Sequence, residues 1–500
     1  MNAAECLLSV GADDAVALQC GDERITYGEL RDAVRCTAGA WRSLGLDAGT
    51  RVVVFAPDSI DWVIAYLGVI WAGGVAIGAN PRLGLADLAP IVADSEVRYI
   101  WCEADASAGV CAMAKTLPIP PAIVSAGNGM GLVWSATLRT AAGIEASERQ
   151  DEDPALWIGT SGTTGIPKGV VHAHRVALGP HSFAQRVLHL TRDDRLYATS
   201  KLFFAYALAN SLFAGLRLGA TVILDRDRPT PERVRAVVAR HRPTILFTVP
   251  TLYNKMVQEG VAPALRGCGI QHFMSAGEAM PNSVRNAWAV ATGQAPISGY
   301  GTSETLSLVL YCDDDSGLLR PTPLTSVRYV DGSDPHAPQR IWIRNSTLAL
   351  GYWRRPGAQA EGFRGGWFSP GDTFLRRSED RLEFTGRQDD MLKVAGQWVS
   401  TIWIEHALAE AGGDAIDQVA AIGVPTREGL TTISVLAVAL PGREDDARRR
   451  LDAAIDRLPQ HRRPCWVYWV SELPVTATGK LQRSRLRDAH ESALSSKEVG

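Results

Sequence analysis

The chain has few of the features that mark nucleic-acid-binding, secreted or disulfide-stapled proteins. Its 500 residues carry a formal net charge of −3, and no basic stripe offers nucleic acid an electrostatic footprint. Its eight cysteines form no C-x-x-C pair and stand beside no histidine cluster at zinc spacing, so we expect reduced thiols in a cytoplasmic protein. Because the first residues lack a basic stretch followed by a long apolar one, we expect no secretory signal.

One uncharged run approaches the length of a membrane span. It covers residues 62–79, but four glycines interrupt it, and three of these lie in its second half. That spacing favours a helix over 62–72, a glycine turn and a short strand around 75–77. We therefore expect no membrane association.

Apolar strands alternate with amphipathic helices along most of the chain, whose apolar content of 46% suits a large buried core. This alternation predicts an α/β fold of helix-covered sheets. The segment 103–150, rich in alanine, glycine and serine, shows no clear pattern. We expect strands at 51–56, 99–102, 220–224 and 244–249, and helices at 60–71, 231–241 and 282–292.

The pattern changes at residues 386–390, which read GRQDD. The remainder predicts a small α/β domain of about 110 residues, a size within the usual range for a domain. We therefore predict a large N-terminal domain over 1–386, a hinge over 387–390 and a small mobile C-terminal domain over 391–500. Within the last, we expect strands at 391–394, 418–423, 432–440 and 466–470, and helices at 401–411 and 445–458.

Residues 160–169, TSGTTGIPKG, have the composition of a phosphate-binding loop. Hydroxyls and exposed backbone N–H groups offer many donors in little space, and Lys168 adds a cation. An apolar run before the loop and the alternating VVHAH after it predict a hairpin-type connection. A Ser/Thr/Gly-rich linker is the alternative, but a linker needs neither the Pro-Lys-Gly end nor flanking strands. The candidate phosphate-binding residues are Thr160, Ser161, Gly162, Thr163, Thr164 and Gly165.

Residues 300–304, YGTSE, place a carboxylate beside two hydroxyls after a strand-like stretch. A carboxylate beside phosphate-binding hydroxyls suits Mg²⁺, which takes oxygen ligands and substrate phosphates. A helix N-cap at Thr302 or Ser303 is an alternative that is compatible with this one.

The loop resembles the signature of the adenylate-forming superfamily, which includes acyl-CoA synthetases, non-ribosomal peptide synthetase adenylation domains and firefly luciferase. Further motifs occur along the chain in the order of that family. Before the loop stands ITYGEL at 25–30, and after it come SAGEA at 275–279, YGTSE, SPGD at 369–372, GRQDD, and PVTATGKLQR at 474–483. The resemblance implies that ATP activates a carboxylic acid as its acyl-adenylate. It also implies transfer to the thiol of coenzyme A or of a carrier-protein phosphopantetheine.

The resemblance assigns roles to individual residues. It implies that Glu304 helps to hold Mg²⁺, that Thr302 contacts the α-phosphate, and that Lys480 bridges the acid and the α-phosphate. Asp372 and Arg387 match the ribose-binding residues, although a proline replaces the threonine usual before the glycine of SPGD. The nucleotide, hinge and pantetheine positions that it also implies are Ala276, Gly277, Glu278, Tyr300, Gly301, Asp389 and Gly396.

Residues 201–210, KLFFAYALAN, resemble the pocket-lining helix of benzoate- and hydroxybenzoate-CoA ligases. The resemblance places Ala205 and Tyr206 against an aromatic ring, which suits the preference of aromatic rings for one another. Ser307 would leave room, or a hydrogen bond, for a ring substituent, which favours a substituted benzoate such as a hydroxy- or aminobenzoate. The predicted pocket residues are Phe204, Ala205, Tyr206, Gly299, Gly301, Leu306 and Ser307.

The sequence is compatible with three functions. The leading one is an aryl-CoA ligase with ATP, Mg²⁺, an aromatic acid and coenzyme A as its partners. A stand-alone adenylation enzyme that loads an aryl acid onto a carrier protein is the second, because basic residues near the C-terminus would serve either acceptor. An inactive nucleotide-binding interaction protein is the third, but it would not need Lys168, Glu304, Asp372 and Lys480 together. A homodimer is left open.

Overall fold

The chain divides into two compact units. The structure is a computed structural model that describes residues 1–134, 141–160, 168–179, 181–330, 337–387, 391–394, 397–426, 431–474, 481–482 and 485–491. The first unit comprises Met1–Met280, Val284–Val327 and Ile343–Phe368, and the second Pro281–Ser283, Arg328–Trp342 and Ser369–Gly500. The predicted domain boundaries and hinge stay predictions, since residues 388–390 lie outside the described residues.

Two large sheets form the framework of the first unit. The strands of one are, from edge to edge, β16 (Arg320–Pro321), β15 (Leu310–Cys312), β14 (Ile297–Tyr300), β13 (His272–Ser275), β12 (Ile245–Thr248), β10 (Arg195–Ala198), β11 (Thr221–Leu224), β1 (Val16–Cys20) and β2 (Glu23–Thr26). Those of the other are β19 (Gly351–Tyr352), β9 (Lys168–Ala173), β8 (Pro154–Thr160), β4 (Val75–Ala79), β3 (Arg51–Phe55), β5 (Tyr99–Glu103), β6 (Ala122–Ala126) and β7 (Leu132–Val133). Central strands of both sheets pair in parallel and are buried on both faces, which explains their apolar runs.

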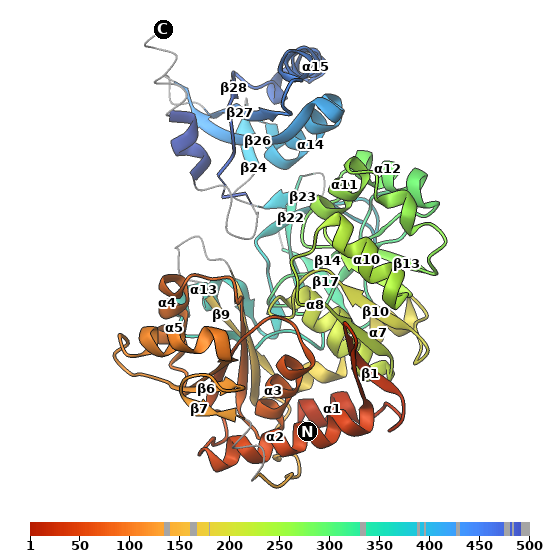
Figure 1. Ribbon diagram of the computed structural model, residues 1–500. Coiled ribbons are helices and arrows are strands. Elements are labelled where there is room, and N and C mark those ends of the chain that lie inside the picture. Colours follow the sequence, from red (N-terminus) through yellow and green to blue (C-terminus); the bar gives the residue numbers. More distant parts are fainter. Residues whose placement is uncertain are drawn as a thin grey trace. The chain divides into compact units, whose positions relative to one another are not determined.

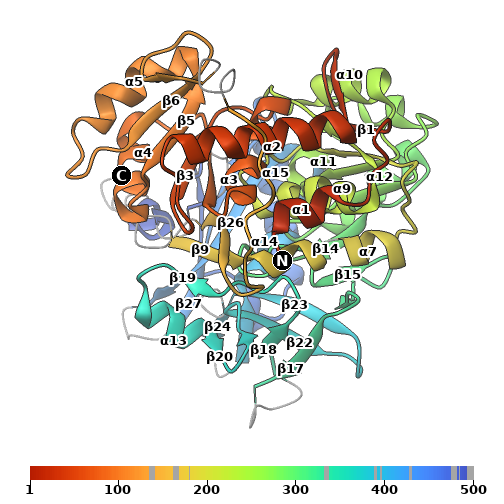
Figure 2. The ribbon, with the colours of Figure 1, turned by 90° about the horizontal axis from the view of Figure 1, so that it is seen from below.

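Helices cover both faces of these sheets. They are α1 (Ala3–Leu8), α2 (Tyr27–Ser43), α3 (Ile60–Trp71), α4 (Leu85–Ser95), α5 (Ala104–Ala114), α7 (His181–Arg186), α8 (Ala205–Ala207), α9 (Ala214–Leu218), α10 (Pro231–His241), α11 (Pro250–Gln258), α12 (Asn282–Thr292) and α13 (Pro356–Gly362). The buried side chains of α2 and α3 share one apolar cluster with β3 and β11, and these helices lie between the two sheets (Figure 2). Helices α4 and α5 pack on the other face of the second sheet, and α10 and α11 pack on the first (Figure 1).

The predicted phosphate loop connects two antiparallel neighbours. Strands β8 and β9 pair from Pro154↔Ala173 to Thr160↔Lys168, which confirms the hairpin-type connection. The segment 161–167 lies outside the described residues. Strand β19 pairs with the other side of β9, so residues far along the chain join the hairpin.

The second unit contains a small three-layered region. The strands of the second unit are the second half of β17 (Ser326–Tyr329), the first part of β18 (Gln339–Arg344), β22 (Asp372–Arg376), β23 (Leu382–Arg387), β24 (Met391–Val394), β25 (Gln397–Ser400), β26 (Ile416–Pro425), β27 (Thr431–Ala439) and β28 (Trp466–Trp469). Helices α14 (Thr401–Gly412) and α15 (Glu444–Arg457) pack on one face of the sheet β26–β27–β28. Leu473 and Leu486 cover its other face.

The expected α/β class is confirmed, and the helices α3, α10 and α12 have the predicted bounds. Their starts are locally encoded: Ser59 caps α3, and Thr230 followed by Pro231 opens α10. The segment 103–150 is more regular than expected, because it contains α5, β6 and β7. Because α5 is rich in alanine, glycine and serine, its apolar periodicity is weak, and the sequence pattern did not predict this helix. In the described part of the chain, no helix is long and apolar enough to cross a membrane.

The contact between α2 and α3 gives a stability prediction. A Cβ atom at Gly68 in α3 would lie 2.2 Å from Thr37 Cγ2, so Gly68→Ala forces these buried helices apart. We expect the free energy of unfolding to fall by about 1–3 kcal/mol, measured by chemical denaturation.

The control is Gly357→Ala in α13, where the added Cβ meets no atom within 4 Å. Because alanine favours helices, this variant should be neutral or slightly stabilised. Equal losses in both variants would contradict close packing as the role of Gly68.

Candidate active site

Lys168 and Glu304, the candidate metal-binding carboxylate, both interact with the side chain of Tyr352. Lys168 Nζ lies 5.5 Å from the ring centroid of Tyr352, and the Tyr352 hydroxyl donates a hydrogen bond of 2.6 Å to Glu304 Oε1. Glu304 is 9% exposed, so its carboxylate is largely withdrawn from water. The structure thus places Lys168 and Glu304 around a residue that sequence analysis did not select.

The residues after β14 form a hydrogen-bonded turn and not the start of a helix, so the N-cap alternative at Thr302 or Ser303 is wrong. The Thr302 N–H donates to Thr305 Oγ1 at 2.9 Å, and the Leu306 N–H donates to the Thr302 carbonyl at 3.1 Å. Leu306 has a positive φ of 59° and turns the chain back toward β15. Side-chain bonds of Thr305 thereby hold Thr302 and Glu304 in a short, fixed turn.

A buried histidine fixes the same turn from β9. His172 Nε2 lies 2.8 Å from the Ser303 carbonyl oxygen, and burial lowers the pKa of His172 from 6.5 to about 4. The ring is therefore neutral near pH 7, and its Nε2–H donates to that carbonyl. On the other side, the Ala349 N–H donates to the Glu304 carbonyl at 2.8 Å. The only sequence signal for His172 was its inward-facing position in VVHAH.

Residues 201–210, the predicted pocket-lining helix that we call the aromatic wall, become helical later than the sequence indicated. A helix was expected across 201–210, but α8 starts at Ala205 and passes into a π-helical segment, Leu208–Phe213. Tyr206 is partly buried, with its hydroxyl inside the protein, and its ring meets Phe247 edge to face with centroids 6.0 Å apart. Its hydroxyl has no hydrogen-bond partner among the described residues, and burial raises its pKa well above the ordinary value. A buried unpaired hydroxyl is suited to meet a polar group of a ligand.

Asn210 joins this wall to the residues that follow the Glu304 turn. Its Nδ2 donates to the Tyr206 carbonyl at 3.0 Å, and its Oδ1 accepts from the Leu308 N–H at 3.3 Å. Leu308 also packs closely on Gly299, where a Cβ atom would lie 2.7 Å from Leu308 Cδ1. At Gly301 a Cβ atom would lie 2.8 Å from the Ser307 carbonyl oxygen. Glycine is therefore needed at 301, where the backbone lies close, whereas a side chain at 299 would have to displace the Leu308 side chain.

The Ser307 hydroxyl is hydrogen-bonded within the protein. Its Oγ lies 2.7 Å from Thr347 Oγ1, and Thr347 in turn donates to the Thr305 carbonyl at 2.6 Å. The hydrogen of Ser307 is thus directed to Thr347, while Asn345 Nδ2 lies 3.5 Å from Ser307 Oγ. A hydrogen bond from this hydroxyl to a ring substituent, one of the two expectations for Ser307, would replace its contact with Thr347, whose Oγ1 also accepts a hydrogen bond of 2.9 Å from Asn345 Nδ2.

A buried carboxylate fixes the start of the aromatic wall. Both oxygens of Asp58 lie 3.1 Å from the Leu202 nitrogen, and burial raises the pKa of Asp58 from 3.8 to about 7. The neighbouring Lys201 donates from Nζ to the Asp225 carbonyl at 2.5 Å. These contacts join the end of β3 and the region after β11 to the residues just before Phe204, which is 39% exposed.

The candidate adenine segment follows β13. Ala276 is buried, and Gly277 has a positive φ of 88°, a conformation that favours glycine. Glu278 accepts a hydrogen bond of 2.7 Å from Thr251 Oγ1 and thereby supports the start of α11.

In the second unit, the two candidate ribose residues are cross-strand partners. Asp372 on β22 stands opposite Arg387 on β23, with Arg387 Nε 3.7 Å from Asp372 Oδ1. Lys480, Asp389 and Gly396 lie outside the described residues, and their roles stay predictions.

The described residues fit a Mg²⁺ ion that is shared with phosphates. They contain no group of three or more His, Cys, Asp or Glu side chains placed to hold a metal by themselves. Mg²⁺ bound with a nucleotide needs only one or two protein carboxylates. Glu304 suits this role, because Tyr352 engages Oε1 and leaves Oε2 as the candidate ligand.

Comparison with known proteins identifies the class of protein. Residues 10–353 match the family described as AMP-binding enzyme, and the chain belongs to this family. It is 37% identical to the 3-hydroxybenzoate–CoA ligase of Aromatoleum sp. (strain CIB), over 98% of this chain and 97% of that protein. It is 34% identical to the 3-hydroxybenzoate–CoA/4-hydroxybenzoate–CoA ligase of Thauera aromatica, over 99% and 98%.

A solved structure agrees with this assignment. The anthranilate CoA ligase AuaEII in complex with anthranoyl-AMP matches with a TM-score of 0.87 and 28% identity, over 98% of this chain and 97% of that one. The expected likeness to adenylate-forming enzymes, and among them to the hydroxybenzoate-CoA ligases, is confirmed.

The buried state of His172 gives a pH prediction. Its pKa is about 4 in the folded protein against an ordinary 6.5, so the unfolded chain binds more protons between these values. The free energy of unfolding should therefore fall as the pH drops through this window, by up to about 1.4 kcal/mol per pH unit from this residue.

Chemical denaturation of the wild type and of His172→Gln across this window measures the effect. The variant lacks the titrating ring, so its stability should depend less steeply on pH. His174, with a similarly lowered pKa, remains in both proteins and cancels in the difference. Identical slopes would contradict the assignment.

Proposed function

We propose that this protein is an aryl-CoA ligase, which uses ATP to convert an aromatic carboxylic acid into its acyl-adenylate and then into its CoA thioester. The observation that carries the proposal is the bridge through Asn210. It ties the carbonyl of Tyr206, in the aromatic wall, to the N–H of Leu308, just after the turn that holds Glu304. The acid pocket and the phosphate-side residues are thereby parts of one hydrogen-bonded framework.

We assign a hydroxy- or aminobenzoate as the acid. The relatives named above act on 3-hydroxybenzoate and 4-hydroxybenzoate, and the matched structure is an anthranilate ligase. The partnerless hydroxyl of Tyr206 supports a polar ring substituent, because a buried hydroxyl gains most from a ligand group that bonds to it.

In the first half-reaction, an oxygen of the acid carboxylate attacks the α-phosphorus of ATP. The bond from that phosphorus to the bridging oxygen breaks, and pyrophosphate leaves with the electron pair. Lys168 and Lys480 balance the negative charge that develops, and Thr302 contacts the α-phosphate. Mg²⁺ held by Glu304 supplies further positive charge to the phosphates when it is bound. Loss of one such stabilising group commonly slows a reaction by about 10²–10³-fold.

In the second half-reaction, the thiolate of coenzyme A attacks the carbonyl carbon of the acyl-adenylate. The carbon–oxygen bond to AMP breaks, and AMP leaves. Asp372 and Arg387 hold the ribose throughout, Asp389 serves as the hinge, and Gly396 borders the pantetheine arm. Lys480 acts in the first step alone, so the two half-reactions can be separated by mutation.

Lys480→Ala tests whether Lys480 acts in the first half-reaction alone. The variant should lose pyrophosphate release with an aryl acid by about 10²–10³-fold, because the charge on the α-phosphate loses a partner. It should still convert a supplied aryl-adenylate and coenzyme A into thioester at nearly the wild-type rate. Stopped-time assays of pyrophosphate and thioester measure the two steps. Unchanged adenylation in the variant would remove Lys480 from the mechanism.

A screen of acids tests the substrate class. We expect pyrophosphate release with hydroxy- and aminobenzoates to exceed that with benzoate and with aliphatic acids. Tyr206→Phe should reduce this preference by about 10-fold, since a hydrogen bond worth about 1 kcal/mol or more is lost with one substrate and not the other. Preferred use of aliphatic acids would refute the aromatic pocket. Mass detection of the product with coenzyme A and with a carrier protein decides the acceptor.

A further inference from the structure

Tyr352 stands between the two charged groups on which the first half-reaction depends. The face of its ring receives Lys168 Nζ at 5.5 Å, and its hydroxyl donates to Glu304 Oε1 at 2.6 Å. No ion pair joins Lys168 to Glu304 in the part of the chain that the structure describes. A direct pair would neutralise both groups, whereas this arrangement leaves the ammonium for phosphates and Glu304 Oε2 for a metal ion.

The backbone of Tyr352 is held by strand pairing and by its own neighbours. Tyr352 stands opposite Val170 in the antiparallel pair of β19 and β9. Its N–H donates to Gln359 Oε1 at 2.9 Å, and its ring meets Phe363 edge to face with centroids 5.4 Å apart. The ring therefore has little freedom to leave its place between Lys168 and Glu304.

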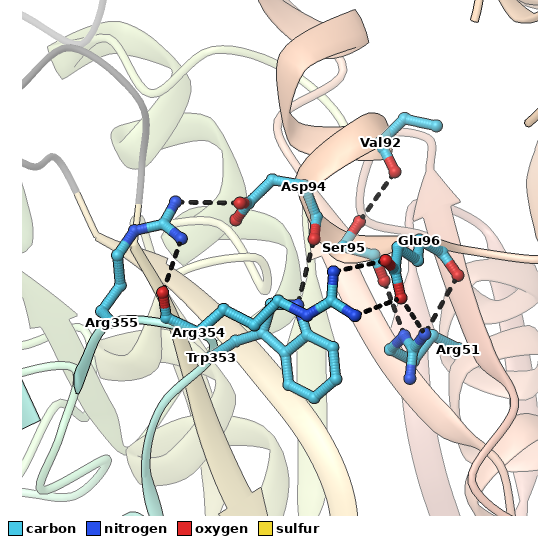
Figure 3. A network of polar contacts seen from close by, with 8 residues as sticks. All are labelled: Arg51, Val92, Asp94, Ser95, Glu96, Trp353, Arg354 and Arg355. Carbon is cyan, nitrogen blue, oxygen red and sulfur yellow. Dashed lines mark hydrogen bonds and ion pairs between the residues drawn. The ribbon is translucent and has the colours of Figure 1, made fainter. Parts of the chain in front are cut away.

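The next residue, Trp353, lies in a network of polar contacts at the end of α4 (Figure 3). Its N–H donates to the Gly169 carbonyl at 2.8 Å, and its indole N–H donates to the Asp94 carbonyl at 3.0 Å. The guanidinium groups of Arg51 and Arg354 lie 4.8 and 5.1 Å from Trp353 ring centroids, and both pair with Glu96 at the end of α4. These contacts fix the position from which Tyr352 reaches the site.

We propose that Tyr352 is a positioning residue that keeps the loop lysine and the metal-binding carboxylate apart and oriented for a magnesium-bound nucleoside triphosphate. This inference deepens the proposed function and rests on it. The hydroxyl acts on the metal side, through Glu304. The ring acts on the phosphate side, through Lys168, because a cation on an aromatic face is held in place yet can be transferred to phosphate oxygens.

Two variants separate the hydroxyl from the ring. Tyr352→Phe removes the hydrogen bond to Glu304 and keeps the aromatic face, whereas Tyr352→Leu removes both. Calorimetry measures the binding of an α,β-methylene analogue of ATP, first with a chelator and then over a range of Mg²⁺ concentrations. Tyr27→Phe is the matched control, since its buried hydroxyl donates to the Ala220 carbonyl at 2.7 Å in the core.

We expect Tyr352→Phe to raise the Mg²⁺ concentration needed for half-maximal binding by about 10-fold, the loss typical of a hydrogen bond to a charged group. Its metal-free binding should equal that of the wild type. Tyr352→Leu should weaken metal-free binding as well. In both variants, thioester formation from a supplied aryl-adenylate should persist, and the control should match the wild type throughout.

Unchanged Mg²⁺ dependence in Tyr352→Phe would overturn the proposal, as would an equal loss in both half-reactions, which indicates a merely structural role. Failure of the proposed function looks different. In that case the wild type forms no adenylate with any aryl acid, while the binding titrations still report whether Tyr352 positions Glu304 and Lys168.

Discussion

The antiparallel pairing of β8 with β9 is the constraint on which the candidate site depends. It sets Lys168 opposite Thr160 on the two strands that flank the predicted phosphate loop, and it directs His172 into the core, where it bonds to the Ser303 carbonyl. The free side of β9 then accepts β19, which brings Tyr352 to Glu304. A one-residue slip in this pairing would turn each of these side chains to the opposite face of the sheet.

Two buried polar side chains hold parts of the site in place through defined hydrogen bonds. His172 is neutral and donates one hydrogen bond, and the Asp58 carboxylate receives the Leu202 N–H. A buried polar group without a partner costs free energy, so such pairs tolerate few alternative arrangements. Tyr206 is the exception in the aromatic wall, since its hydroxyl has no partner among the described residues. This hydroxyl supports the proposed contact of Tyr206 with a polar group of the acid.

Local signals explain which elements could be predicted. Helices α3 and α10 begin with side-chain caps. Helix α3 is apolar on nearly every face and α10 on one face, so their bounds are visible in the sequence. Helix α5 has neither a side-chain cap nor a strong stripe, and it forms because the adjacent sheet buries Val110 and Met113. The π-helical segment after Ala207 likewise has no local signal. It occurs where Asn210 reaches both Tyr206 and Leu308.

The sequence by itself determined the family, and it predicted the chemistry of the site from the loop at 160–169, YGTSE and SPGD, because these are short motifs whose residues are close to one another in the chain. It also predicted that residues 201–210 line the acid pocket. Only the tertiary structure decided that Tyr352 holds Glu304 and that His172 holds Ser303, contacts that span 48 and 131 residues. Such contacts leave no periodic pattern, since their geometry arises only when separate strands pair and bury the side chains between them.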